Sequence, residues 1–352
     1  MTSTSFFRRV PWRTIGWAVH AVVRVVICVL VLPYAAAKVI LLQMGVVDYP
    51  GLLITLGEKS PMGLLWTFMA FSPWVQFLAG AVELLAAALV LWRRTAWLGG
   101  LIGAVSLGVV WLLNMTFDVP VKQFAFAQMV LFLIVLAPWV PRLVAFALGR
   151  AVPEMHYPRL IPWPRAHRLT RWLPPVVAAG MLIAGLAAPA ILVPKQFPTV
   201  HEELADVWQV AHDSSQPAPQ LLDDARLSTL ALGKRSVGGA PVLRQFEGDP
   251  GEFAGASVRR ANGDLQAGFY RVDDSEPGQP RVDLYLLAPM ASDEQNFGAG
   301  EEFTDEYHLR YRLVDGQLLL DDDAHQLTLR PSDTGSLLLD RGFRWQGSPL
   351  NR

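Results

Sequence analysis

Two charged residues stand inside long apolar stretches, where a charge is the feature most suggestive of chemistry. Arg24 lies 11 residues after Arg13, and Glu83 lies 10 residues before Arg93. A charge within a bilayer is costly and normally faces a partner or a wet cavity. At a rise of about 1.5 Å per residue, both lie roughly 15–17 Å from one membrane boundary. We therefore predict a structural ion pair between Arg24 and Glu83; in the alternative, Glu83 is a proton acceptor or part of a ligand site.

A second group of polar residues lies near the opposite ends of these stretches. It consists of Lys38, Asn114, Asp118 and Lys122, with Pro120 between the last two. Four polar side chains at one depth predict a pocket between helices that binds an amphipathic headgroup. The alternative is a capped helical hairpin, in which Asp118 caps the helix that starts near Pro120 and Lys38 reaches the lipid headgroups.

Motifs of the common catalytic and cofactor-binding classes are absent from the sequence. It has no P-loop, dinucleotide fingerprint, CxxC pair, haem-attachment motif or HExxH pattern, and its seven histidines do not pair at metal-ligand spacing. The single cysteine, Cys28, excludes an intrachain disulfide. We therefore expect no metal site, and whether the protein is an enzyme stays open.

Composition identifies the elements that would position these residues. The chain has 352 residues, of which 52% are hydrophobic and only 17% charged, with a mean hydropathy of +0.30. A membrane-spanning helix needs about 20 mostly apolar residues, and five stretches qualify: 14–42, 62–91, 96–113, 124–141 and 173–194. Residues 1–194 contain 15 Lys/Arg and 5 Asp/Glu, whereas residues 195–352 contain 15 Lys/Arg and 26 Asp/Glu. We therefore expect a basic membrane domain followed by an acidic domain in water.

The positive charges of the short loops predict the orientation. Eleven Lys/Arg precede the first span or lie in the loops after spans two and four, against two, Lys59 and Lys122, in the alternate loops. Positive charges mark the cytoplasmic side. We therefore expect a multi-pass protein of the bacterial inner (plasma) membrane, with a cytoplasmic N-terminus and a periplasmic or extracellular C-terminal domain. A signal peptide cleaved near residues 35–37 is an alternative, although the apolar run that continues to Leu42 argues against it.

The acidic C-terminal part has the alternation typical of β-strands. Asn262-Gly263 and Asp315-Gly316 are turn signals between two pairs of predicted strands. We expect a small sandwich or an open barrel with Trp345 in its core, preceded by a short helix at 199–212 and a Pro-rich linker at 214–220. The predicted strands are 227–232, 255–261, 265–272, 281–287, 307–313, 317–321, 326–329 and 336–339.

Several segments carry a resemblance to a known family: YAAAK at 34–38, GLLWTFMAFSPWVQFLAGAVELLAAALVLWRR at 63–94 and LNMTFDVPVK at 113–122. Over residues 14–149 the chain resembles the DoxX-like integral membrane family, whose members look like four-helix bundles with a glutamate after a Gly/Ala pair in the second helix, here Glu83. The tail RGFRWQGSPLNR resembles that of a subgroup with a fifth transmembrane helix and an outer domain. Arg344 and Gly347 stand where other members tend to have His and Glu, which argues against a polar role of this tail.

The resemblance implies an α-helical membrane bundle of four DoxX-like helices and a fifth transmembrane helix, followed by an extracytoplasmic, mainly β domain. We predict a four-helix transmembrane domain at 1–150, a basic cytoplasmic loop at 151–171 and the fifth transmembrane helix at 172–194. A short helix and linker at 195–220 then lead to the β-rich domain at 221–352.

The resemblance leaves two functions open. The family takes its name from a membrane subunit of a thiosulfate:quinone oxidoreductase, so the first hypothesis is a membrane subunit of a quinone-linked redox system. A quinone would then lie against Lys38, Asn114, Asp118 and Lys122, with Glu83 as proton acceptor and a partner subunit as electron donor. The alternative is a non-enzymatic accessory, assembly or cargo-binding protein that docks a partner membrane protein. Both hypotheses place the protein in the lipid bilayer, and neither expects a nucleic-acid partner.

Overall fold

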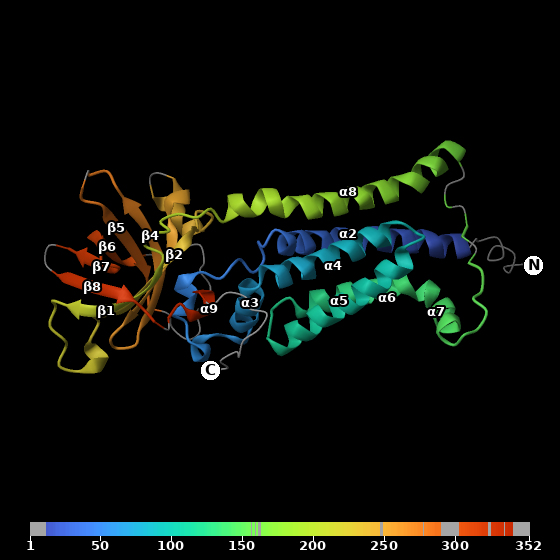
Figure 1. Ribbon diagram of the computed structural model, residues 1–352. Coiled ribbons are helices and arrows are strands. Elements are labelled where there is room, and N and C mark those ends of the chain that lie inside the picture. Colours follow the sequence, from blue (N-terminus) through green and yellow to red (C-terminus); the bar gives the residue numbers. More distant parts are fainter. Residues whose placement is uncertain are drawn as a thin grey trace, which may run out of the picture. The chain divides into compact units, whose positions relative to one another are not determined.

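The chain folds into two compact units. The computed structural model describes residues 12–155, 157–158, 160, 163–246, 249–276, 278–289, 303–322, 325–333 and 335–340. The first unit, which we name the helical unit, comprises Met1–Val46 and Pro61–Val193. The second, the barrel unit, comprises Val47–Ser60 and Pro194–Arg352. Figure 1 shows the helices and strands of both.

The helical unit is built around a four-helix bundle. Its helices are α2 (Trp12–Val39), α3 (Pro61–Phe71), α4 (Pro73–Leu91), α5 (Ala96–Thr116), α6 (Lys122–Leu136), α7 (Val140–Ala147) and α8 (Pro164–Gln196). Neighbours pack in a ring, α2 on α4, α4 on α5, α5 on α6 and α6 on α2. The core between them contains Ile27, Val31, Ala87, Phe132 and Val135.

Within the described residues, five helical segments are long and apolar enough to cross a membrane, as predicted. They are Trp12–Val39, Pro73–Leu91, Ala96–Thr116, Lys122–Ala147 and Arg171–Gln196. The fifth packs on the bundle core through Met181 and Leu182. Most of its large apolar side chains, including Val176, Ile183 and Leu186, are exposed, which suits a helix surrounded by lipid tails.

The second predicted span is not one helix, and this prediction was wrong. Residues 62–91 form α3 and α4, which are separated at Ser72. Pro73 lacks a backbone N–H and restricts the residue before it to extended conformations, and Ser72 is indeed extended at φ −115° and ψ 91°. The break shortens the second span to α4 and leaves α3 as a separate short helix.

The barrel unit is a closed barrel of eight antiparallel strands. The strands are β1 (Asp206–Asp213), β2 (Leu227–Ser236), β3 (Ala254–Arg260), β4 (Leu265–Asp273), β5 (Arg281–Leu287), β6 (Phe303–Val314), β7 (Gln317–Asp321) and β8 (Gln326–Pro331). Each strand pairs with its neighbours in sequence, and β1 pairs with β8 to close the ring. Short 3-10 turns lie at Tyr49–Leu52, Leu56–Glu58, Leu221–Asp223, Pro241–Gln245 and Pro250–Glu252, and α9 at Leu337–Asp340. The prediction of a sandwich or an open barrel was therefore wrong, because the pairing of β1 with β8 closes the ring and removes the strand edges that either of those folds would leave exposed.

Aromatic side chains fill one end of the barrel. Trp208 and Tyr270 are buried in the core with leucines of β2, β5, β7 and β8. The Trp208 indole N–H donates to the Leu204 carbonyl at 2.8 Å, and the Tyr270 hydroxyl donates to the Gly233 carbonyl at 2.7 Å. Their polar atoms are therefore satisfied although the rings are buried.

The segment between α2 and α3 folds onto the outside of the barrel. The Asp48 carboxylate accepts the backbone N–H groups of Lys234 and Arg235, each at 2.9 Å. The Arg259 guanidinium donates to both carboxylate oxygens of Glu58, at 2.6 and 2.8 Å. This hydrogen bond to Arg259 lowers the pKa of Glu58 to about 2. Residues 47–60 therefore belong to the barrel unit, although they are far from it in sequence.

Most of the predicted β-strands are confirmed, but three predictions about the C-terminal part of the chain are wrong. The helix predicted at 199–212 is wrong, because Asp206–Asp213 is β1, which pairs with β2 and β8 and points Trp208 and Val210 into the core. The strand predicted at 336–339 is instead the short helix α9. The domain boundary at 221 is wrong, since β1 precedes it. Trp345 and the tail that carried part of the resemblance lie outside the described residues.

Candidate ligand cavity in the helical unit

A cavity of about 680 Å³ lies within the helical unit. Its walls come from α2, α3, α4, α5 and α6 and from the segments that join α2 to α3 and α5 to α6. Most of the lining is aliphatic or aromatic. The polar side chains among the lining residues are Lys38, Gln43, Glu83, Ser106, Asn114 and Gln128. An apolar cavity with a few convergent polar groups is the usual form of a small-molecule site.

An ion pair between Lys38 and Glu83 forms part of the cavity wall. The Lys38 ammonium donates to the two carboxylate oxygens of Glu83 at 2.6 and 2.7 Å. The two side chains are only 6% and 2% exposed. Each charge would be expensive in this setting without the other, so the pair fixes α2 against α4.

Gly80 explains how the two helices come close enough for this pair. A Cβ atom at position 80 would lie 2.7 Å from the Cβ of Lys38 and 2.8 Å from the Ala35 carbonyl oxygen. A larger residue would push α2 away from α4 at the level of the ion pair. Gly80 lies one helical turn before Glu83, so its close contact sets the register of the pair.

The predicted ion pair between Arg24 and Glu83 is wrong. The Arg24 guanidinium donates instead to the carbonyls of Val90 and Leu91, at 3.4 and 3.2 Å, where α4 ends. The last carbonyls of a helix lack intrahelical partners and carry partial negative charge, so they suit a cation. The prediction assumed that Arg13 and Arg93 lie at the same depth in the membrane. The first turns of α2 instead extend beyond the end of α4.

His20 also lies in this inner part of the bundle. One ring nitrogen, Nε2, is 2.9 Å from the Val135 carbonyl, and the ring packs against Trp17 and Trp139. It does not line the cavity. His20 and Arg24 therefore serve helix packing here, and Glu83 belongs to the cavity.

Three residues that line the cavity, Gln43, Ser106 and Asn114, make no side-chain hydrogen bond within the described residues. Of these, Asn114 is 6% exposed. Gln128 is half-satisfied, because its amide N–H donates to the Leu30 carbonyl at 3.1 Å while its side-chain oxygen has no partner among the described residues. The free side-chain atoms of Asn114 and Gln128 are therefore available to a ligand in the cavity, and such a ligand would complete their hydrogen bonds.

Asp118 and Lys122 do not reach the cavity. They form an ion pair one helical turn apart at the start of α6, with the Asp118 side chain 79% exposed. Asp118 is not the predicted helix cap either, because α6 begins at Lys122 and makes no side-chain cap hydrogen bond. The structure thus brings Lys38 and Asn114 together with Glu83, and leaves the other two predicted residues outside.

Sequence reasoning missed Gln128 and Gln43. The side-chain oxygen of Gln43 is buried without a partner among the described residues. Gln128 is the one strongly polar side chain in the apolar stretch 124–141, and such a residue within a membrane span is a functional candidate even without a charge. That signal was available, whereas Gln43 lies outside the predicted spans.

Comparison with known proteins gives a relative without an assigned activity. No protein-family profile matches the chain, and no solved structure matches it. The uncharacterized protein YwoB of Bacillus subtilis (strain 168) is 33% identical over 120 residues, which is 34% of this chain and 75% of that protein. Membership of the DoxX-like family stays a prediction. At this identity and coverage, the chain belongs to the same family as YwoB.

Proposed function

We propose that the helical unit binds an apolar molecule with an oxygen-bearing head group, a quinone or a lipid-like amphipath, in the cavity beside Lys38 and Glu83. The observation that carries the proposal is the largely buried Asn114, whose side-chain amide has no partner among the described residues and lines a mostly apolar cavity together with Lys38 and Glu83. An amide N–H there would donate to a carbonyl oxygen of the ligand and so satisfy a group that the protein leaves unpaired.

The donor and acceptor pattern favours a quinone. Two of the three N–H groups of the Lys38 ammonium donate to the two oxygens of Glu83, and the third N–H has no partner among the described residues. This third N–H and the amide N–H groups of Asn114 are donors for quinone carbonyls. The free oxygen of Gln128 offers an acceptor for the hydroxyl group of the reduced form. One site could therefore bind both redox forms.

The cavity has room for a head group and part of an apolar tail. Its volume of about 680 Å³ lies within the usual range for ligand pockets. Leu78 and Val82 of α4 and Val105 and Val109 of α5 line it and are also exposed. The cavity is therefore open along these two helices, on a surface that would face lipid tails. An isoprenoid or acyl chain could enter from there.

We further propose that the protein is the membrane subunit of a quinone-linked redox system, with the electron donor in a partner subunit. The sequence carries no flavin or metal-site motif of its own. Glu83 as proton acceptor stays a prediction. The second candidate, a non-enzymatic accessory protein, shares the same cavity but would use it to hold a lipid or a partner helix.

The proposed orientation has a cytoplasmic N-terminus and an outer barrel unit. Residues 47–60, which follow the first span, and the C-terminal barrel belong to one unit and so must lie on the same side of the membrane. Five crossings meet this requirement. In a chain with Cys28 replaced, an impermeant maleimide applied to intact cells should label Gln317→Cys and spare Arg94→Cys. Labelling of position 94 would contradict the orientation.

Ligand binding can be tested by thermal-shift titration of the purified protein with a short-chain benzoquinone. Binding to the folded state alone raises its stability, so the wild type should show saturable stabilisation. Asn114→Leu, which removes the amide, and Val110→Phe, which fills the cavity, should abolish it. Val22→Phe is the matched control, because Val22 is exposed on α2 and does not line the cavity. No shift with the quinone, together with stable copurification of another membrane protein, would favour the accessory function.

A further inference from the structure

A second cavity, of about 280 Å³, lies at the other end of the barrel from Trp208 and Tyr270. In an up-and-down barrel successive strands alternate in direction, so the ends of odd strands and the starts of even strands meet at one rim. The lining residues come from β1, β2, β3, β5, β6 and β8 and from the segments that join β1 to β2 and β7 to β8, all at this rim or just inside it. We name this cavity the barrel mouth. It is lined by Asp213, Ser215, Ala225, Arg226, Leu227, Val258, Arg260, Leu284, Leu286, Tyr307, Leu309, Asp322, His325 and Leu327.

The inner part of the barrel mouth is apolar. Val258, Leu284, Leu286 and Leu309 line it from the core side, and all four belong to the buried core of the barrel. Eight-stranded barrels either fill their interior with side chains or hold one small ligand. Here the aromatic residues fill one end, and the other end is left hollow above a floor of Val and Leu.

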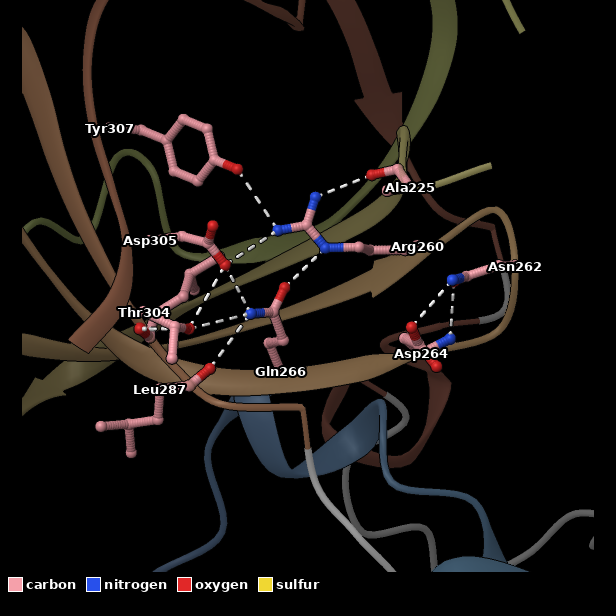
Figure 2. A network of polar contacts seen from close by, with 10 residues as sticks. Ala225, Arg260, Asn262, Asp264, Gln266, Leu287, Thr304, Asp305 and Tyr307 are labelled. Carbon is pink, nitrogen blue, oxygen red and sulfur yellow. Dashed lines mark hydrogen bonds and ion pairs between the residues drawn. The ribbon is translucent and has the colours of Figure 1, made fainter. Parts of the chain in front are cut away.

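The rim of the barrel mouth carries two guanidinium groups in fixed positions. Figure 2 shows Arg260 held by Gln266 at 2.5 Å, by the Ala225 carbonyl at 2.7 Å, and by Asp305 and Tyr307 at 3.3 Å each. Arg226 donates to both oxygens of Asp224, from Nε and Nη2, each at 2.9 Å. A further contact joins Arg226 to the Ser215 carbonyl at 3.4 Å. Both side chains are therefore preorganised before any ligand arrives.

These contacts leave hydrogen-bond donors unused at the rim. A guanidinium has five N–H groups. The bonds above use three of Arg226 and four of Arg260, and the Tyr307 hydroxyl proton has no acceptor among the described residues. The acidic lining residues already accept backbone N–H groups, Asp213 that of Ser215 and Asp322 that of His325. The unused N–H groups of Arg226 and Arg260 and the Tyr307 hydroxyl proton can donate to a ligand head group that accepts hydrogen bonds.

We propose that the barrel mouth binds a medium-chain monocarboxylate, with its chain on the Val/Leu floor and its carboxylate against Arg226, Arg260 and Tyr307. Planar guanidinium groups match a carboxylate with paired hydrogen bonds, which are stronger than neutral ones. At about 30 Å³ for each water-sized group, 280 Å³ holds roughly nine non-hydrogen atoms. Octanoate has ten non-hydrogen atoms, so it matches this size when its carboxylate lies at the rim.

Octanoate itself is the probe. The full-length protein in lipid nanodiscs is dialysed against radiolabelled octanoate, and empty nanodiscs give the background. We expect saturable binding of one octanoate per chain. Leu327→Trp and Leu227→Trp, which place a large ring in the barrel mouth, should each weaken binding at least about tenfold, because the chain loses the apolar surface that it would bury. Leu313→Trp is the matched control, since Leu313 is exposed on β6 and does not line the mouth. Equal binding by all variants, or none by the wild type, would overturn the proposal.

Competition with two other probes tests the head group. Octylammonium and octanol have the same chain as octanoate but lack a carboxylate, so neither should displace it at equal concentration. Displacement by either as effective as that by unlabelled octanoate would overturn the assignment of a carboxylate ligand. Val110→Phe in the helical unit should leave octanoate binding unchanged. This control separates failure here from failure of the proposed quinone site, which is a different cavity in the other unit.

Discussion

Buried charged side chains have different kinds of partner in the helical unit and in the barrel unit. In the helical unit, Lys38 and Glu83 are both almost fully buried and bind each other alone among the described side chains. In the barrel unit, buried Asp283 binds both Arg271, at 3.1 Å, and His308, at 2.7 Å, and the latter two are partly exposed. The Lys38–Glu83 pair is isolated from solvent, whereas Asp283 shares its charge between two partners that reach the surface.

Because of this difference, an unpaired polar group is stronger evidence for a bound ligand in the helical unit than in the barrel unit. Where lipid tails surround the helices, an unpaired amide has few alternative partners, so Asn114 supports a ligand site together with the apolar cavity that it lines. At the barrel rim, water can complete any hydrogen bond, so unused donors carry meaning only together with a hollow of suitable size. The two proposed sites therefore rest on different kinds of observation.

Breaking the Lys38–Glu83 pair should have the largest effect. Lys38→Met leaves Glu83 as an uncompensated buried charge, and such losses typically cost about 3–5 kcal/mol. Lys38→Met combined with Glu83→Leu removes both charges and should recover most of this free energy. Thermal unfolding of the single and double variants in nanodiscs measures the difference. If the double variant were as unstable as the sum of the single ones, the two side chains would not interact in the membrane.

Adding a methyl group at Gly80, where α4 touches α2, should have the next largest effect on stability. Gly80→Ala places a methyl group against backbone atoms of α2 and should cost about 1–3 kcal/mol by overpacking. Gly180→Ala on α8 is the matched control, because a Cβ there meets nothing within 4 Å. Its stability should be unchanged or higher by up to about 1 kcal/mol, from the better helix propensity of alanine. Equal effects of the two substitutions in thermal unfolding would show that Gly80 does not set the helix spacing.

A smaller, pH-dependent effect is expected in the barrel unit. Arg259 lowers the pKa of Glu58 from 4.5 to about 2, so the carboxylate binds its proton less tightly in the folded state. The stabilisation is therefore fully present above pH 4.5 and is lost as the pH falls through about 2. Because the Glu58 side chain is 40% exposed, we expect less than about 1 kcal/mol. The melting temperatures of wild type and Glu58→Gln should differ at pH 6 and converge as the pH is lowered. A constant difference would contradict this assignment.

The sequence predicted the elements better than it predicted their contacts. Apolar length identifies a membrane helix because the bilayer thickness requires it, and the Asn262-Gly263 and Asp315-Gly316 turns mark strand pairs because few residues tolerate those turns. The break at Ser72 was missed although Pro73 signals it. The closed barrel could not be foreseen, because closure depends on β1 pairing with β8 across the whole domain.

The partners of single side chains depend on helix register, which the apolar pattern does not contain. Lys38 and Asn114 were grouped by depth, and they do line one cavity. The depth estimate pairs Glu83 with Arg24, but the close approach of α2 and α4 at Gly80 lies at the level of Lys38, which binds Glu83 instead. Small residues that permit close packing therefore decide which charges meet, and their effect appears only in three dimensions.

The smallest effect is expected for the two predicted site residues that the structure leaves outside the cavity. Lys122 pairs with Asp118 one turn away at the exposed start of α6, where solvent screens the interaction. Lys122→Ala should therefore leave the melting temperature and the quinone-dependent thermal shift unchanged, whereas Asn114→Leu should abolish that shift. The two variants compare residues from one predicted group, of which one lines the cavity and the other does not. If Lys122→Ala removed the shift as well, the head group would lie at the helix ends near Asp118, and the pocket predicted from the sequence would describe the site better than the buried cavity does.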